Sequence, residues 1–196
     1  MVEISRRRAI EDVAAELFRS HGYAATSVRD IARALDIQGP SLYAHVASKE
    51  DVLWAIVDRT AARFEATAAA AATGRSGSTD AATRLSDLVR AHVRVITDDV
   101  GAAAVFVHEW RSLGELRRAS ILGRRDAYEA RFRSVVVEGM ATGTFVMTDA
   151  PLAAMTILSA LNGIPGWYQG DGRLTPDRLA DHFVDFVLRM LQGADQ

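Results

Sequence analysis

Residues 26–49 read TSVRDIARALDIQGPSLYAHVASK, and this stretch decides the fold. Ser27 and Asp30 have the spacing of a capping box, which predicts the start of a short helix. Asp36 stands where the chain has to turn sharply, and Asp enters the left-handed backbone region at a lower cost than most residues. A third helix is expected at residues 38–46. Two short helices joined by a tight turn are typical of a helix-turn-helix, which places its second helix in the major groove of DNA.

Helical periodicity continues through the rest of the chain, and only residues 144–147 resemble a strand. The sequence predicts an all-α protein of about nine helices, with a flexible loop at residues 73–79. We expect residues 1–47 to form the helix-turn-helix domain and residues 48–196 to form a larger helical domain for ligand binding and dimerisation. The other expected helices are residues 10–21, 28–35, 48–72, 85–96, 101–111, 115–141, 151–162 and 176–191.

Composition limits the classes of function. The 196 residues are 49% hydrophobic, which is enough for a substantial core, and the chain has no cysteine for disulfides or thiolate metal sites. No apolar stretch approaches the roughly 18 residues of a membrane-spanning helix, so we expect a cytoplasmic protein without a membrane partner. The His108-Glu109 pair lacks the second histidine of a zinc motif, because residue 112 is Ser. No catalytic, metal or cofactor site is predicted.

The net charge of −2 means that contacts with DNA would depend on locally clustered groups. In the third helix, Gln38 and Ser41 are suited to base edges, and Tyr43 and His45 are suited to phosphates. The alternative is that short helices with polar outer faces are ordinary protein surface. The predicted DNA-contacting residues are Arg6, Arg7, Ser27, Gln38, Gly39, Pro40, Ser41, Tyr43, His45 and Lys49.

Two groups of cations support the DNA interpretation. Lys49 is the single lysine beside 22 arginines, and it follows the expected helix cap Ser48. A cation in the first turn opposes the helix dipole, and a phosphate bound there by the backbone amides would offset that cost. Arg6 to Arg8 precede the first expected helix and could form an arm along the DNA.

The same stretch resembles the N-terminal domain of the TetR family of bacterial transcriptional regulators. Two positions depart from the family pattern: Asp36 replaces Gly, and Val46 replaces Phe. The resemblance implies a repressor that binds palindromic operator DNA and dimerises through its last two helices. The matching residues are Ser27, Ile31, Ala32, Ile37, Tyr43, His45, Ser48, Lys49, Glu50, Val52 and Leu53.

The second half of the chain is similar to the KstR2-like branch of that family, whose members respond to acyl-coenzyme A thioesters. Seven arginines between Arg111 and Arg133 are suited to the phosphates of coenzyme A. The alternatives are ordinary surface arginines and core aromatics, a non-CoA hydrophobic effector of the drug-efflux type, or an acyl-CoA-binding protein or enzyme without DNA function. His92 is interpreted as a core histidine. The predicted ligand-binding residues are Trp110, Arg124, Tyr128, Asn162 and Trp167.

Overall fold

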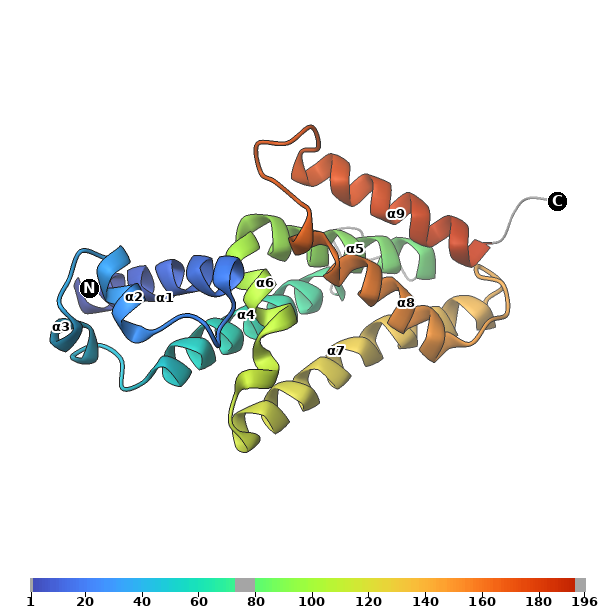
Figure 1. Ribbon diagram of the computed structural model, residues 1–196. Coiled ribbons are helices and arrows are strands. Elements are labelled where there is room, and N and C mark those ends of the chain that lie inside the picture. The colour runs from blue at the N-terminus through green and yellow to red at the C-terminus, as the bar shows by residue number, and fades with distance from the viewer. Residues whose placement is uncertain (1, 73–79, 193–196) are drawn as a thin grey trace. The chain divides into compact units, whose positions relative to one another are not determined.

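The computed structural model describes residues 2–72 and 80–192, and the predicted loop at 73–79 lies outside them. Every regular element in this part of the chain is a helix, which confirms the all-α prediction (Figure 1). No strand forms at residues 144–147. The elements are α1 (Val2–His21), α2 (Val28–Ala34), α3 (Gly39–Tyr43), α4 (Lys49–Ala72), α5 (Ala81–Asp98), α6 (Val100–His108), η1 (Trp110–Ser112), α7 (Glu115–Ala141), α8 (Ala150–Asn162), η2 (Ile164–Gly166) and α9 (Pro176–Gln192).

The chain packs as two compact units. The first comprises Met1–Ala61 and Asp99–Gly123, and the second comprises Ala62–Asp98 and Arg124–Gln196. These units describe packing, and the functional boundary at residues 47 and 48 stays a prediction. None of the helices in the described ranges is long and apolar enough to cross a bilayer.

Helix α1 begins earlier than predicted. It starts at Val2, so the arginine run at residues 6–8 lies inside the helix and the expected N-terminal arm is wrong. Helical spacing brings Arg8 to Asp12 one turn later, where Nε lies 2.8 Å from Oδ1. Arginine has a high helix propensity and such pairs add a little more, so the helix continues beyond the apolar stripe that defined its predicted start.

The turn between α2 and α3 forms as expected. Ser27 caps α2, and its hydroxyl accepts from the Asp30 amide while the Asp30 carboxylate accepts from the Ser27 amide. Asp36 has φ 54°, which is the left-handed conformation predicted for it. The Ile37 amide then bonds to the Ala32 carbonyl at 3.0 Å, which closes the end of the helix.

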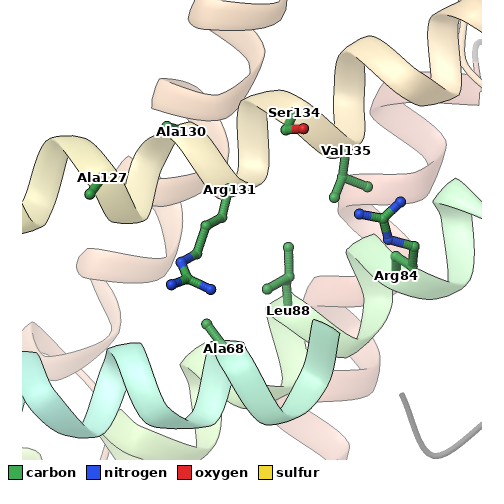
Figure 2. A pocket seen from close by; sticks show the side chains of 8 residues that line it. All are labelled: Ala68, Arg84, Leu88, Ala127, Ala130, Arg131, Ser134 and Val135. Carbon is green, nitrogen blue, oxygen red and sulfur yellow. The ribbon is translucent and has the colours of Figure 1, made fainter. Parts of the chain in front are cut away.

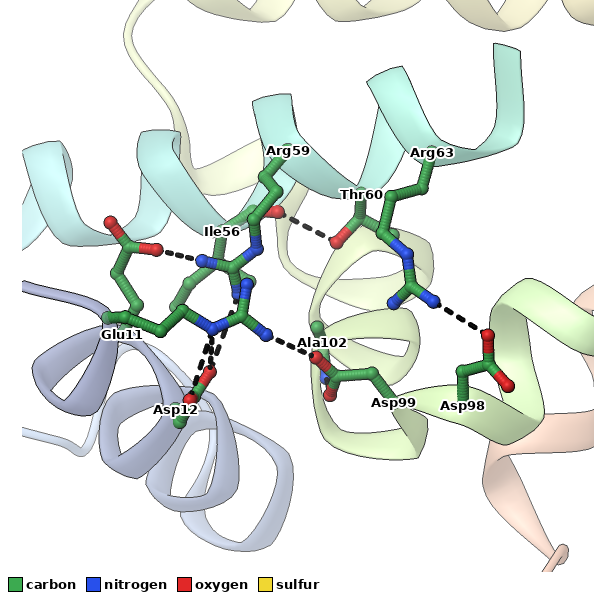
Figure 3. Close-up of polar contacts among 10 residues, drawn as sticks. Glu11, Asp12, Ile56, Arg59, Thr60, Arg63, Asp98, Asp99 and Ala102 are labelled. Atoms are coloured by element: carbon green, nitrogen blue, oxygen red, sulfur yellow. Dashed lines mark hydrogen bonds and ion pairs between the residues drawn. The ribbon is translucent and has the colours of Figure 1, made fainter. Parts of the chain in front are cut away.

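The first unit has a core of apolar side chains from several helices. Ile10 and Phe18 of α1 are fully buried, as is Leu42 of α3. Helix α6 packs against α1, and Asp99 caps α6 by accepting from the Ala102 amide at 3.0 Å. The polar edge of this core is an ionic network that includes Glu11, Asp12, Arg59 and Asp99 (Figure 3).

The second unit is organised around α5. This helix packs against α9, which buries Leu179, Val184 and Val187 on one side. Helix α8 also contacts α5 and begins at a cap formed by Asp149, whose carboxylate accepts from the Leu152 amide at 2.8 Å. Both α8 and α9 also have apolar side chains on their outer faces, which the second unit leaves exposed.

Candidate DNA interface and effector region

Helix α3 presents the face that the sequence predicts for base recognition. Gln38 is the N-cap residue, and its exposed side chain makes no capping bond. Ser41 is exposed, and Tyr43 has 56% of its surface accessible. On the opposite side Leu42 is fully buried and holds the helix against the core. The polar groups of α3 are therefore positioned by a rigid support and remain available to a partner.

The other predicted residues of α3 complete this face. Gly39 leaves open space, because no atom lies within 4 Å of the position that a Cβ would take. Pro40 lies in the first turn, where a missing backbone N–H costs nothing. His45 is half-buried, and its Nδ1 has no hydrogen-bond partner within residues 2–72 and 80–192.

Lys49 lies at the first position of α4, and its ammonium group is partly engaged inside the protein. Nζ donates to the carbonyl oxygens of Tyr23 and Thr26, each at 2.8 Å, and lies 4.1 Å from the centre of the Tyr23 ring. These contacts offset the unfavourable position of a cation in the first turn. An ammonium group has three donors, so a phosphate contact through the third stays a prediction.

The remaining predicted DNA contacts lie on exposed parts of α1 and at the start of α2. Arg6 and Arg7 are exposed, and Arg7 Nε lies 3.4 Å from Glu11 Oε1. The Ser27 hydroxyl lies 2.6 Å from Asp30 Oδ2, so it already has a partner in the capping box. Contacts of these residues with DNA stay predictions.

In the second unit, Tyr128 lies in a buried cluster with His92, and Asn162 lies beside them. His92 has only 2% of its surface exposed, and its Nδ1 lies 3.1 Å from the Tyr128 hydroxyl. Phe64 and Phe132 pack on the same rings. Burial lowers the pKa of His92 to about 3, helped by the charge of Arg125 and opposed by Asn162. His92 therefore lies in the core of the second unit, as expected for a core histidine, and burial favours its neutral form.

Arg124 has a partner that the sequence did not indicate. Its Nε and Nη2 bond to Glu65 Oε1 and Oε2 at 2.6 and 2.9 Å, which is the paired geometry of an arginine–carboxylate fork. Arg117, also in α7, pairs with Glu50 and Asp51 in the first unit. Two of the seven arginines of this segment are therefore paired with acids of α4. A ligand contact by Arg124 stays a prediction and would require competition with Glu65.

The two predicted tryptophans have different environments. Trp110 belongs to the first unit, where it is buried beneath the Arg111 guanidinium at 4.6 Å from its ring. Trp167 belongs to the second unit, follows η2 and is 54% exposed. Their roles in ligand binding stay predictions.

The second unit has a hollow formed by α4, α5 and α7 that was not predicted from the sequence (Figure 2). Its volume is about 320 Å³, and it contains the side chains of Arg84 and Arg131. Ala127, Ala130 and Ser134, small residues at helical spacing on α7, were the signal that could have indicated it.

Two family models match the chain. Residues 10–56 match the bacterial regulatory proteins of the tetR family, and residues 78–191 match the tetracyclin repressor-like C-terminal domain. The HTH-type transcriptional repressor KstR2 of Rhodococcus jostii is 28% identical over 189 residues, covering 93% of this chain and 89% of the relative.

Two solved structures are similar to this chain over nearly its whole length. The ketosteroid transcriptional regulator KstR2 of Mycobacterium tuberculosis has a TM-score of 0.89 and 25% identity, covering 96% of this chain and 95% of that one. AibR, solved with isovaleryl coenzyme A and operator DNA, has a TM-score of 0.80 and 26% identity, covering 95% and 98%. The second family model alone spans more than half of the sequence. The chain therefore belongs to the TetR family of transcription regulators, a family of DNA-binding proteins and not of enzymes.

Proposed function

We propose that this regulator is a homodimeric repressor whose two copies of α3 enter successive major grooves of a palindromic operator. The observation that carries the proposal is the face of α3, where Gln38, Ser41 and Tyr43 are exposed while Leu42 is buried. Dimeric proteins of this kind read half-sites about 34–36 Å apart or a multiple of that distance. A partner copy is therefore needed for specific binding.

We further propose that the effector is an acyl-coenzyme A thioester of lipid or sterol breakdown. Support comes from AibR, which is similar over 95% of this chain and was solved with isovaleryl coenzyme A. The cluster of Tyr128, His92 and Asn162 supplies polar groups in an otherwise apolar part of the second unit. Such a combination is typical of small-molecule sites.

Release from DNA would follow from a shift between two states of the dimer. Helix α4 begins next to the helix-turn-helix at Lys49 and ends in the second unit at Ala72, so its movement would reposition α3. An effector that binds the released state 10- to 100-fold more tightly supplies about 1.4–2.8 kcal/mol of coupling.

Operator binding is tested by fluorescence anisotropy with the promoter DNA beside the protein's own gene. Wild-type protein should bind this DNA selectively, and the affinity should fall with salt because phosphate contacts release counterions. Tyr43→Ala should weaken binding about tenfold, whereas Tyr43→Phe should keep the ring contact and lose only the hydroxyl contact. Circular dichroism checks that both variants fold. The absence of salt-sensitive, sequence-selective binding would refute the DNA-binding proposal.

The effector is tested with the protein–operator complex. Acyl-coenzyme A thioesters should displace the DNA and raise the melting temperature of the free dimer, while free coenzyme A and free fatty acids should do less. Release by a hydrophobic compound without coenzyme A would favour the drug-efflux type of regulator. If acyl-coenzyme A thioesters, free coenzyme A and free fatty acids all leave the complex and the melting temperature unchanged, the acyl-coenzyme A proposal is refuted. The proposal of operator binding would not be affected.

A further inference from the structure

The N-terminal ends of α4 and α7 are joined by a group of ionic contacts within the first unit. The Arg117 guanidinium of α7 pairs with both acids in the first turn of α4: one nitrogen lies 3.3 Å from Glu50 Oε1, and a second bonds to Asp51. The Gly114 amide, directly before α7, donates to the same Glu50 oxygen at 3.1 Å. These four residues are called the Arg117 clamp below.

The start of α7 is fitted to this contact in charge and in backbone shape. Arg117 lies in the first turn of α7, where the helix dipole disfavours a cation, and the two carboxylates of α4 offset that cost. The hydrogen bond to Asp51 raises the pKa of Arg117, and hydrogen bonds from Ser48 and Arg117 lower the pKa of Asp51. A Cβ at Gly114 would lie only 3.2 Å from Glu50 Oε1, so glycine permits the close approach.

The clamp and Lys49 hold the first turn of α4 from two sides. Lys49 donates to the carbonyls of the segment between α1 and α2, whereas the two residues that follow it bind the start of α7. Leu113, which precedes the clamp, is buried and anchors the start of α7 in the apolar core of the first unit. The first turn of α4 is therefore fixed against a rigid support.

Helix α3 depends on this turn for its position. It has only five residues, and a helix this short is held in place mainly by its neighbours. Residues 44–48 connect it to α4. The connection is tight, because Val46 is buried and its amide bonds to the Leu42 carbonyl at 3.2 Å. A shift of the first turn of α4 would therefore be passed on to α3.

We propose that Arg117 is a positioning residue for operator recognition, which fixes the first turn of α4, and thereby the orientation of α3, without contacting DNA. The inference rests on the proposed binding of DNA by α3. Without the clamp, α3 would sample several orientations, and the apparent affinity for the operator would fall with the fraction of molecules in the competent one. Non-specific binding depends on phosphate contacts and would remain.

Anisotropy titrations with the operator and with a scrambled duplex of the same length test this role. Arg117→Gln should bind the operator about tenfold more weakly, while its affinity for the scrambled duplex and its salt dependence stay unchanged. Arg118→Gln is the matched control, because it removes the neighbouring arginine, which is exposed and outside the clamp. It should bind as wild type does, and circular dichroism measures the folding of both variants.

Two results of these titrations would overturn the inference. One is wild-type affinity of Arg117→Gln for the operator. The other is an equal loss of affinity for both duplexes with a weaker salt dependence, because that result indicates a direct phosphate contact by Arg117.

Glu50→Gln tests whether Arg117 acts through the clamp. This variant loses the carboxylate charge but keeps an oxygen for the Gly114 amide. It should weaken operator binding less than Arg117→Gln does, since the pair of Arg117 with Asp51 remains. The double variant should bind like Arg117→Gln, because both changes remove the same ion pair. Additive losses would show that Arg117 and Glu50 act separately and would overturn the inference.

Hydrogen exchange of the free protein tests the same role without DNA. In Arg117→Gln, the amides of residues 38–54 should exchange about tenfold faster, while those of α9 should exchange as in wild type. Arg118→Gln should match wild type throughout. Unchanged exchange at residues 38–54 would overturn the inference. If wild type binds no operator but Arg117→Gln shows the faster exchange, the proposed function is wrong and the role of Arg117 in holding α3 stands.

Discussion

At the scale of single residues, Lys49 joins α4 to the segment between α1 and α2. Its ammonium donates to two carbonyls, those of Tyr23 and Thr26, and it is partly buried. Lys49→Met should lower the free energy of unfolding by about 1–3 kcal/mol, because both carbonyls lose a charged donor. Urea denaturation at one fixed protein concentration measures the change.

Arg33→Met is the matched control, since it also removes a cation from the first unit. Its side chain is 81% exposed, and its one ion pair within residues 2–72 and 80–192 is with Asp30 in the same helix. We expect no measurable loss of stability, because such exposed pairs contribute little. Equal losses for the two variants would contradict the role of Lys49 in folding. Weaker DNA binding by a Lys49 variant is informative only after its stability has been measured.

His92 makes the stability of the protein depend on pH. Its folded-state pKa is lowered to about 3, whereas an unfolded histidine titrates near 6.5. Between these values the unfolded chain binds a proton that the folded chain excludes, so stability falls as pH falls. From pH 7.5 to 5 this group should cost about 2 kcal/mol. Denaturation of wild type and His92→Gln at both pH values measures how much of the loss of stability is due to His92. An equal loss in the two proteins would contradict this role of His92.

The residue-level expectations that the structure confirms depend on local geometry. The Ser27 and Asp30 capping box and the positive φ of Asp36 follow from spacing and intrinsic backbone preference. The partners of Lys49 and Arg124 could not be predicted in the same way. Arg124 bonds to Glu65, 59 residues earlier, and such pairs become visible only when the helices pack.

At the scale of elements, the C-terminal end of α7 depends on a close contact between Gly139 and the Phe145 ring. A Cβ at Gly139 would overlap this ring. Gly139→Ala should therefore lower the free energy of unfolding by about 1–3 kcal/mol. Gly123, also inside α7, has no atom within 4 Å of its Cβ position, so Gly123→Ala should stabilise the helix by about 0.5–1 kcal/mol. Thermal denaturation of both variants should show shifts of opposite sign, and shifts of the same sign would contradict the packing of Phe145.

The bounds of the later helices were predictable because their signals are strong. Helix α7 matches its predicted range of 115–141, and α8 and α9 begin within one residue of predicted starts marked by Pro151 and Pro176. The predicted start of α1, Ile10, lies eight residues after the observed start, Val2, because apolar periodicity marks only the buried part of a helix. Charged residues such as the arginines at 6–8 extend the exposed end of the helix at little cost in free energy.

At the scale of the whole molecule, two long helices contribute to both packing units. Residues 49–61 of α4 belong to the first unit and the rest to the second, and α7 divides after Gly123. Sequence periodicity defines each helix but not its neighbours, so the division between units could not be predicted. A regulator that transmits a signal needs such shared elements, because a change at one end of a helix moves the other.

The proposed dimer depends on apolar side chains that the second unit leaves exposed on α8 and α9. Met155 of α8 is 54% exposed and Phe186 of α9 is 68% exposed, although Ala154 and Val187 beside them are buried. Both helices pack against α5, and large apolar side chains left exposed on such helices are typical of an interface. Met155→Glu combined with Phe186→Glu should convert the dimer to monomers at micromolar concentration, because the interface would have to bury unpaired carboxylates.

Sedimentation velocity measures the oligomeric state, and the anisotropy assay measures operator binding in parallel. The double variant should sediment as a monomer that keeps its helical content and loses selective affinity for the palindrome. Leu116→Glu is the control, since Leu116 on α7 is 88% exposed and belongs to the first unit, whereas α8 and α9 belong to the second. It should remain dimeric. A dimer that persists in the double variant would show that the two copies associate through a different surface, and the half-site spacing of the operator would then have to be derived from that surface.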